Sequence, residues 1–162
     1  MNKLFDKSMY LEEETHTYIL QGKEHIEFTS VTECISEYFE KFDKDKIAYK
    51  LVTTSPKYRG RKKEDLIAEW DATAKFGTKV HKEIEDYINT KESPKTERAI
   101  EGVKWLNKYL LKSDYDIYPE TIIYCEKYKI AGTVDLLIYD KKNKIYFLLD
   151  WKTSKKINTS SF

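Results

Sequence analysis

Residues 118–151 restrict the fold of this chain more than any other part of it. Three stretches rich in Ile, Val, Tyr, Leu and Phe are separated by short turns, namely Tyr118–Tyr128, Ile130–Asp140 and Ile145–Trp151. Aromatic and β-branched residues favour strands, and short connections join strands that run antiparallel. The sequence therefore predicts a three-stranded antiparallel meander.

The turn between the second and third strands determines which residues face each other. An even-length turn centred between Lys142 and Asn143 is expected, because asparagine tolerates positive φ. This register pairs Asp135 with Asp150, and on the same face it pairs Leu137 with Leu148 and Thr133 with Lys152. The opposite face is uninterruptedly apolar and is expected to be core, with Val134, Leu136 and Ile138 against Ile145, Phe147, Leu149 and Trp151.

Two opposed acidic side chains are the candidate functional groups of the meander. Directly opposed residues have Cβ atoms about 4.5–5.5 Å apart, and like charges at that distance destabilise a sheet unless a cation or a proton lies between them. Because no cysteine is near, an oxygen ligand set suits Mg²⁺ or Mn²⁺ better than zinc. The alternative is that Asp135 and Asp150 are solvated, or that one of them pairs with Lys152.

Glu120 is the third candidate acid. It lies beside Asp135 if the first turn is even and is centred between Lys127 and Tyr128. The alternative is an exposed residue that follows Pro119 at the start of the strand.

Lys152 points to the same side as Asp150, since the two are two residues apart. Its ammonium group there can position or activate a water and neutralise charge on a phosphate. Carboxylates alone would bind a cation, whereas an added lysine indicates a reaction.

The rest of the chain is predicted to be mostly helical. Apolar stretches at Tyr10–Leu11, Thr17–Leu20 and Ile26–Phe28, with a turn signal at Gln21–Lys23 between the last two, are expected to form a small hairpin. A helix that Thr29 or Ser30 caps and that reaches Phe39 is expected to follow. Further helices are expected over residues 43–51, 64–89 and 95–111, with Gly77 marking a junction or a close approach. The predicted fold class is α/β of the mixed α+β kind, a central mixed sheet with helices in a single domain (1–162). Residues 1–60 form its N-terminal hairpin and helices, and residues 64–162 form its core.

The composition of the chain limits which classes of function it can have. Charged residues make up 35% of the chain but the net charge is only +1, so nucleic acid would have to bind to local basic patches. Cys34 and Cys125 are far apart and are expected to be ordinary thiols. No apolar run approaches the roughly 20 residues that cross a bilayer, and the N-terminus has no secretion signal. We expect a cytoplasmic protein without a membrane partner.

Several short motifs together resemble one enzyme superfamily. Residues 131–135 (AGTVD) followed by residues 150–153 (DWKT) are similar to the PD-(D/E)xK nucleases, in particular their RecB-like exonuclease branch, which includes phage exonucleases and the mitochondrial genome maintenance exonuclease. Residues 77–81 (GTKVH) match that branch's Gly-x-x-x-His element. Residues 14–18 (ETHTY) and 30–32 (SVT) are similar to the N-terminal hairpin and helix of the phage-type members. The resemblance covers most of the chain and implies a phage-like or prophage origin.

The resemblance implies a restriction-endonuclease-like core and assigns roles to residues. Asp135 and Asp150 would bind the catalytic Mg²⁺ or Mn²⁺, with His81 as a ligand from the helix and the carbonyl of Trp151 completing the site. Lys152 would be the catalytic lysine, and Glu120 matches the acidic residue before the Gly-x-x-Asp strand. Glu85, four residues after His81, could orient its imidazole or could be an ordinary surface residue.

Basic residues supply the expected contacts with DNA. The densest run is residues 57–63, where Lys57, Arg59, Arg61 and Lys62 could hold phosphates and Tyr58 could stack on a base. Lys79 and Lys82 on the long helix could do the same. The alternative for each run is a solvated surface.

The chain departs from the family after residue 153. Family members continue into a Gln-x-x-x-Tyr helix and usually another strand, whereas this sequence stops at Phe162, so the core is expected to be incomplete. Either the chain is a fragment, or a second copy or a partner chain supplies the rest, or the fold is kept without turnover. The expected function is a Mg²⁺-dependent deoxyribonuclease, an exonuclease acting in DNA repair or recombination. The alternatives are a DNA-binding or interaction module that has lost turnover, and a protein-binding domain unrelated to DNA.

Overall fold

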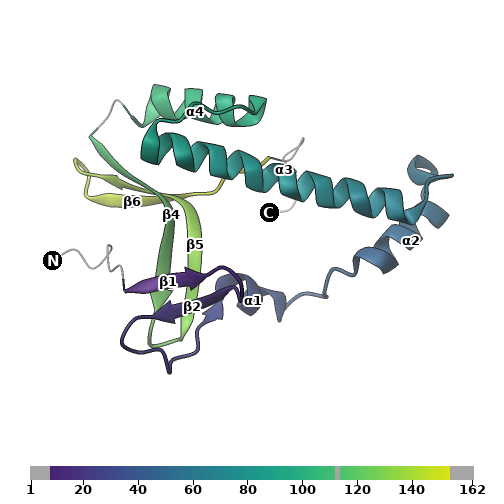
Figure 1. Cartoon of the computed structure of the whole chain (residues 1–162), viewed down its shortest axis with the longest axis horizontal. Coiled ribbons are helices and arrows are strands. Elements are labelled where there is room, and N and C mark those ends of the chain that lie inside the picture. Colours follow the sequence, from purple (N-terminus) through teal and green to yellow (C-terminus); the bar gives the residue numbers. More distant parts are fainter. Residues whose placement is uncertain (1–7, 112–113, 154–162) are drawn as a thin grey trace. The chain divides into compact units, whose positions relative to one another are not determined.

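The protein has a mixed α+β fold with one two-stranded sheet and one mixed four-stranded sheet, which confirms the predicted class. This computed structural model describes residues 8–111 and 114–153. The elements, labelled in Figure 1 where there is room, are β1 (Met9–Glu12), β2 (Thr17–Leu20), β3 (Thr29–Ser30), α1 (Val31–Ser36), α2 (Lys44–Thr54), the 3₁₀ turn η2 (Pro56–Tyr58), α3 (Lys63–Thr90), α4 (Glu97–Tyr109), β4 (Tyr115–Cys125), β5 (Ile130–Asp140) and β6 (Ile145–Leu149). None of the helices among the described residues has the length and apolarity to cross a bilayer.

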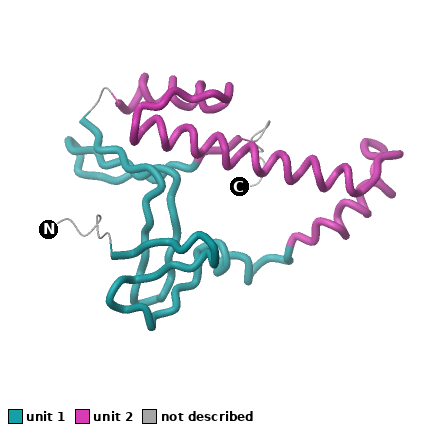
Figure 2. Tube along the Cα trace, in the orientation of Figure 1, with its two compact units in different colours: residues 1–41, 114–150 teal, residues 42–113, 151–162 magenta. Residues whose placement is uncertain are grey.

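The chain divides into two compact units, which Figure 2 colours separately. Unit 1 consists of residues 1–41 and 114–150, and it contains both sheets and α1. Unit 2 consists of residues 42–113 and 151–162, and it contains α2, η2, α3 and α4.

The N-terminal hairpin of unit 1 differs from the prediction. β2 pairs with β1, from Met9 opposite Leu20 to Glu12 opposite Thr17, whereas residues 26–28 are not a strand. The predicted turn at Gly22 does form, with φ of 80°, but it leads the chain into β3, which pairs in parallel with the start of β5. The prediction was wrong for Ile26–Phe28, because a run of only three residues carries little periodic signal.

Helix α1 starts where the sequence predicts and stops earlier. The side chain of Ser30 caps it by accepting a hydrogen bond from the backbone N–H of Glu33. The helix ends at Ser36, and Tyr38 and Phe39 beyond it are 81% and 70% exposed. These two aromatic rings therefore do not extend a buried helical face as predicted.

The meander of unit 1 forms in the predicted register. Leu137 lies opposite Leu148 in the β5–β6 pair, and Leu137 also lies opposite Tyr118 in the β4–β5 pair. Both pairs are antiparallel. The two short turns and the period-two pattern therefore predicted the strand alignment correctly.

The turn between β5 and β6 is built around Asp140 rather than Asn143. The buried carboxylate of Asp140 accepts hydrogen bonds from the backbone N–H groups of Lys142 and Asn143 and from the amide of Asn143, at 2.8–2.9 Å. These hydrogen bonds lower the pKa of Asp140, and the two from Asn143 have the largest effect on it. Positive φ falls on Lys144, at 56°, so the turn has the predicted length with a different residue in the left-handed conformation.

Strand β6 is less buried than predicted. Leu136 and Ile138 of β5 are 0% and 2% exposed, but Ile145 and Phe147 of β6 are 45% and 43% exposed. In the described sheet β6 pairs with β5 alone, so it is an edge strand. The prediction that this face is continuous core is therefore wrong for β6.

Unit 2 is helical, and its helices begin and end close to the predicted residues. Asp43 and Thr96 cap α2 and α4 through their side chains. α3 runs unbroken through Gly77 for 28 residues, and a Cβ at Gly77 would lie 3.2 Å from the Thr153 hydroxyl, which is the predicted close approach. The fully buried side chains include Leu66, Ile84 and Leu106.

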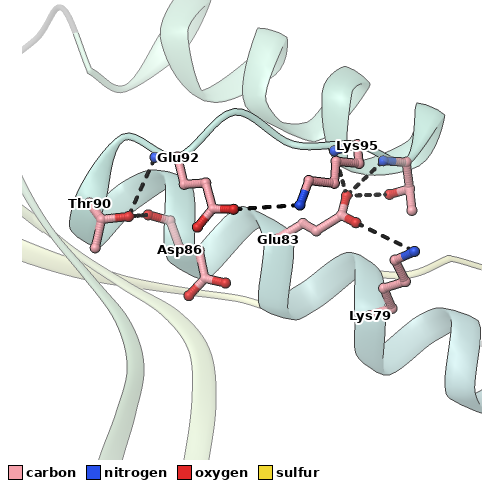
Figure 3. Close-up of polar contacts among 7 residues, drawn as sticks. Lys79, Glu83, Asp86, Thr90, Glu92 and Lys95 are labelled. Atoms are coloured by element: carbon pink, nitrogen blue, oxygen red, sulfur yellow. Dashed lines mark hydrogen bonds and ion pairs between the residues drawn. The ribbon is translucent and has the colours of Figure 1, made fainter.

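A half-buried carboxylate on α3, that of Glu83, fixes the start of α4 (Figure 3). The Oε2 atom of Glu83 accepts hydrogen bonds from the backbone N–H groups of Lys95 and Thr96 and from the Thr96 hydroxyl, at 2.7–2.9 Å. Its Oε1 atom is buried and has no hydrogen bond, and Lys79 lies 4.0 Å away. Burial opposes ionisation, but the bonds from Thr96 and Lys95 outweigh it and lower the pKa of Glu83.

We expect Glu83→Gln to reduce the free energy of unfolding by about 2 kcal/mol at neutral pH, because hydrogen bonds to a charged group are worth about 1.5–3 kcal/mol. A lowered folded pKa stabilises the protein above the unfolded pKa of about 4.3, and this contribution is lost as pH falls through the folded pKa. Urea unfolding at neutral and acidic pH therefore should show the variant's deficit shrinking in acid. Glu92→Gln, at an exposed carboxylate that pairs with Lys95, is the control, and an equal loss in both variants would contradict this role.

Candidate active site

The candidate site in unit 1 lies on a segment of β5 that has a strand on one side only. Along one edge, β5 pairs with β4 throughout its length. On the other edge β3 pairs with Ile130 and Ala131, and β6 pairs from Leu136 onwards. Residues 132–135, the Gly-Thr-Val-Asp segment, therefore lie between the ends of two strands in the described sheet.

Glu120 and Asp135 come together as the register predicts. Pro119 lies opposite Leu136 and Thr121 lies opposite Val134, so Glu120 occupies the position opposite Asp135. A carboxylate oxygen of Glu120 lies within 4.8 Å of one of Asp135. Glu120 is exposed and Asp135 is half-buried, and two carboxylates at this separation repel unless a cation or a proton lies between them.

The backbone of Glu120 is in an unusual conformation for the middle of a strand. Its φ is 45°, in the left-handed region that costs an ordinary L-residue roughly 1–2 kcal/mol. The register is the same on both sides of it, so no extra residue is inserted there. Strained residues of this kind gather at functional sites.

A pocket of about 380 Å³ in unit 1 contains both carboxylates. Besides Glu120 and Asp135 it is lined by hydroxyl groups, one imidazole and a few apolar residues, namely Leu11, His16, Tyr18, Ser30, Val31, Thr32, Gly132 and Thr133. No periodic pattern in the sequence indicated His16 or Thr32 as site residues. The only hint was that both lie in segments similar to the phage-type nucleases.

Asp150 lies at the end of the ladder rather than within it. The β5–β6 pairing ends with Leu136 opposite Leu149, one pair before the predicted pair of Asp135 and Asp150. Among the described residues, Asp150 does not form a group with Glu120 and Asp135 in which all three carboxylates are within 4.8 Å of one another. The predicted pair of Thr133 and Lys152 is absent from the ladder as well.

In unit 2, His81 on α3 contacts the segment that follows β6. Its Nε2 atom lies 2.8 Å from the backbone carbonyl oxygen of Trp151. The Trp151 ring packs edge-on against Trp105 of α4, with the ring centroids 5.9 Å apart. Two contacts from two helices therefore hold Trp151, and the exposed Lys152 follows it directly.

Glu85 does not have its predicted partner. Its carboxylate accepts a hydrogen bond of 2.9 Å from Lys82, one turn earlier on α3, instead of orienting the imidazole of His81. Lys82 also pairs with Asp86 at 3.1 Å. The bonds to Glu85 and Asp86 raise the pKa of Lys82, so a phosphate at Lys82 would have to compete with two carboxylates.

The basic run before α3 also lies in unit 2 and is partly neutralised. Arg61 pairs with Glu69 at 2.8 Å, and Lys57 lies over the ring of Tyr58, 5.0 Å from its centroid. Tyr58 is half-buried, whereas Arg59 and Lys62 are exposed. Among the predicted DNA contacts in this run, Lys57, Arg59 and Lys62 are exposed to solvent.

Comparisons with protein-family models, with curated proteins and with solved structures gave no match. The resemblance to the nuclease superfamily therefore depends on the motifs of the sequence alone.

Proposed function

We propose that the protein is a metal-dependent DNA nuclease with a restriction-endonuclease-like core. The observation that carries this proposal is the pair of acidic side chains, Glu120 and Asp135, that adjacent strands hold within 4.8 Å in a pocket. The proposal also draws on the sequence resemblance of residues 131–135 and 150–153. An exonuclease is the preferred form because the resemblance is to the exonuclease branch.

The donor groups fit Mg²⁺ or Mn²⁺. Both ions prefer oxygen ligands, and carboxylates are the commonest of them. In unit 1, Glu120 and Asp135 would hold the ion.

Such an ion, when bound, lowers the pKa of water and stabilises charge on a phosphoryl oxygen. The side chains of the protein do the remaining work. The carboxylates of Glu120 and Asp135 orient the reacting groups, and the ammonium of Lys152 donates hydrogen bonds to a phosphate oxygen. The exposed cations of residues 57–62 attract the DNA backbone without regard to its sequence.

The second candidate function is a DNA-binding module that does not cleave. It is favoured by the end of β6 at Leu149 and by the position of Asp150 outside the carboxylate pair. Without a third carboxylate, the site would bind a cation more weakly and would have fewer groups to position a reacting water.

A time course on end-labelled and circular DNA with Mg²⁺, Mn²⁺ or EDTA separates the two functions. We expect end-labelled DNA to shorten with either metal and to stay intact in EDTA. Circular DNA should persist if cleavage starts at ends. DNA that is shifted in a gel but keeps its length in all arms would contradict the nuclease and support the binding module.

A further inference from the structure

We propose that the unit 1 pocket contains a nucleotide subsite, in which His16 contacts the phosphate and Leu11 and Val31 contact the base. This inference deepens the proposed function and rests on it, because it names the part of the DNA strand that the pocket holds. It concerns one nucleotide of a single strand next to the bond to be cleaved.

The residues that line the pocket are of two chemical kinds. Glu120 and Asp135 supply negative charge, which repels a phosphate unless a cation screens it. The other lining residues offer an imidazole at His16, hydroxyl groups at Thr32 and Thr133, and apolar surface. Imidazoles and hydroxyls donate hydrogen bonds to phosphate and sugar oxygens, as side chains commonly do in complexes with DNA.

The position of His16 is fixed by its turn and by its neighbours. It closes the turn between β1 and β2 with φ of 53°, a conformation in which histidine is more common than most residues. Its ring lies edge-on to Tyr18, 6.4 Å between centroids. The Tyr18 hydroxyl in turn is 3.1 Å from the Thr133 hydroxyl, on the strand that carries Asp135, so a chain of contacts links the imidazole to the carboxylate strand.

The apolar wall suits a nucleobase. Val31 is 43% exposed and packs over Gly132, where an added Cβ would lie 2.9 Å from the Val31 Cγ2 atom. The absence of a side chain at Gly132 therefore lets Val31 approach the strand closely. Leu11, from β1, is half-buried and lines the same pocket.

The volume of the pocket limits what it can hold. At about 380 Å³ it is near the lower end of the roughly 300–1,000 Å³ that small-molecule sites occupy. This space accepts a single nucleotide but not a stacked base pair. A phosphate ion alone would leave the apolar wall unused.

The test is an NMR titration with thymidine 5′-monophosphate in the presence of Ca²⁺, with thymidine and inorganic phosphate as separate arms. We expect the mononucleotide to shift the amide signals of Leu11, His16, Thr32 and Gly132. Thymidine and phosphate should each bind at least about tenfold more weakly, because each lacks half of the contacts. His16→Gly, which keeps the backbone conformation, should weaken mononucleotide binding about tenfold through the loss of a charge-assisted hydrogen bond.

His25→Gly is the matched control, since His25 is exposed in the turn before β3 and does not line the pocket. The inference is overturned if the mononucleotide shifts none of these signals, if phosphate binds as tightly as the mononucleotide, or if His16→Gly and His25→Gly bind alike. Binding is measured without cleavage, so the two proposals fail separately. A protein that cleaves DNA but does not bind the mononucleotide contradicts only the subsite, and one that binds without cleaving contradicts only the nuclease.

Discussion

Replacing Asp135 with asparagine is expected to reduce metal-dependent DNA degradation about 1,000-fold or more. A bound divalent ion supplies several kcal/mol of transition-state stabilisation, and each 1.36 kcal/mol is a factor of ten in rate. Asparagine has nearly the same shape as aspartate, so the half-buried position in β5 should tolerate it. The measurement is the initial rate of loss of end-labelled DNA with Mg²⁺ and with Mn²⁺.

The same variant should lose stabilisation by metal. An ion at 100 times its dissociation constant adds about 2.7 kcal/mol, which corresponds to roughly 5–10 °C in Tm for a chain of this length. Asp116→Asn is the control, because Asp116 lies on β4 and pairs with Lys141 at 2.6 Å. If Asp135→Asn and Asp116→Asn retained equal activity and equal metal stabilisation, Asp135 would not be a ligand.

Glu120→Gly is expected to impair activity about 100-fold or more while leaving the metal-free protein as stable as before or up to about 1 kcal/mol more stable. Glycine relieves the cost of φ at 45°, although it loses more backbone entropy on folding. It also removes the repulsion between the carboxylates of Glu120 and Asp135. Stability gained at the expense of activity is the pattern expected where strain is retained for function.

Lys129→Gly is the matched control for Glu120→Gly. Lys129 also has positive φ, at 52°, and lies in the turn between β4 and β5 outside the pocket. Both variants should change the free energy of unfolding, measured in urea with EDTA, by similar amounts, and only Glu120→Gly should lose activity. A fully active Glu120→Gly variant would contradict a role for this carboxylate.

The meander was predictable from the sequence because its determinants are local. The turns before β5 and β6 are short, which leaves few possible registers. A shift of one residue would also have moved every apolar side chain to the other face of the sheet. For this reason the position of Glu120 opposite Asp135 follows from the sequence without knowledge of the rest of the fold.

Features that depend on distant segments were not predictable. The two-residue strand β3 pairs with β5 across about a hundred residues, and nothing local in Thr29 or Ser30 indicates this. The apolar composition of β6 predicted burial, but burial depends on a neighbouring layer that the strand's own sequence does not reveal. The pocket residues His16 and Thr32 were missed for the same reason, since only the tertiary fold brings them to β5.

The contact between Glu85 and His81 that we considered does not form, because charged side chains on one helix compete for partners. Glu85 lies four residues after His81 but only three after Lys82, and a fully charged ammonium is a stronger partner than an imidazole. Helical spacing identifies which side chains can meet, but it does not decide between two partners.

Paramagnetic broadening by Mn²⁺ in the NMR spectrum of the protein tests the central claim most directly. We expect substoichiometric Mn²⁺ to broaden first the amide signals of Glu120, Thr133 and Asp135. In the Asp135→Asn variant, the signals of these positions should no longer be the first to broaden. Broadening that starts at the acidic turn of Glu12–Glu14, or that is unchanged in Asp135→Asn, would contradict a metal site formed by Glu120 and Asp135.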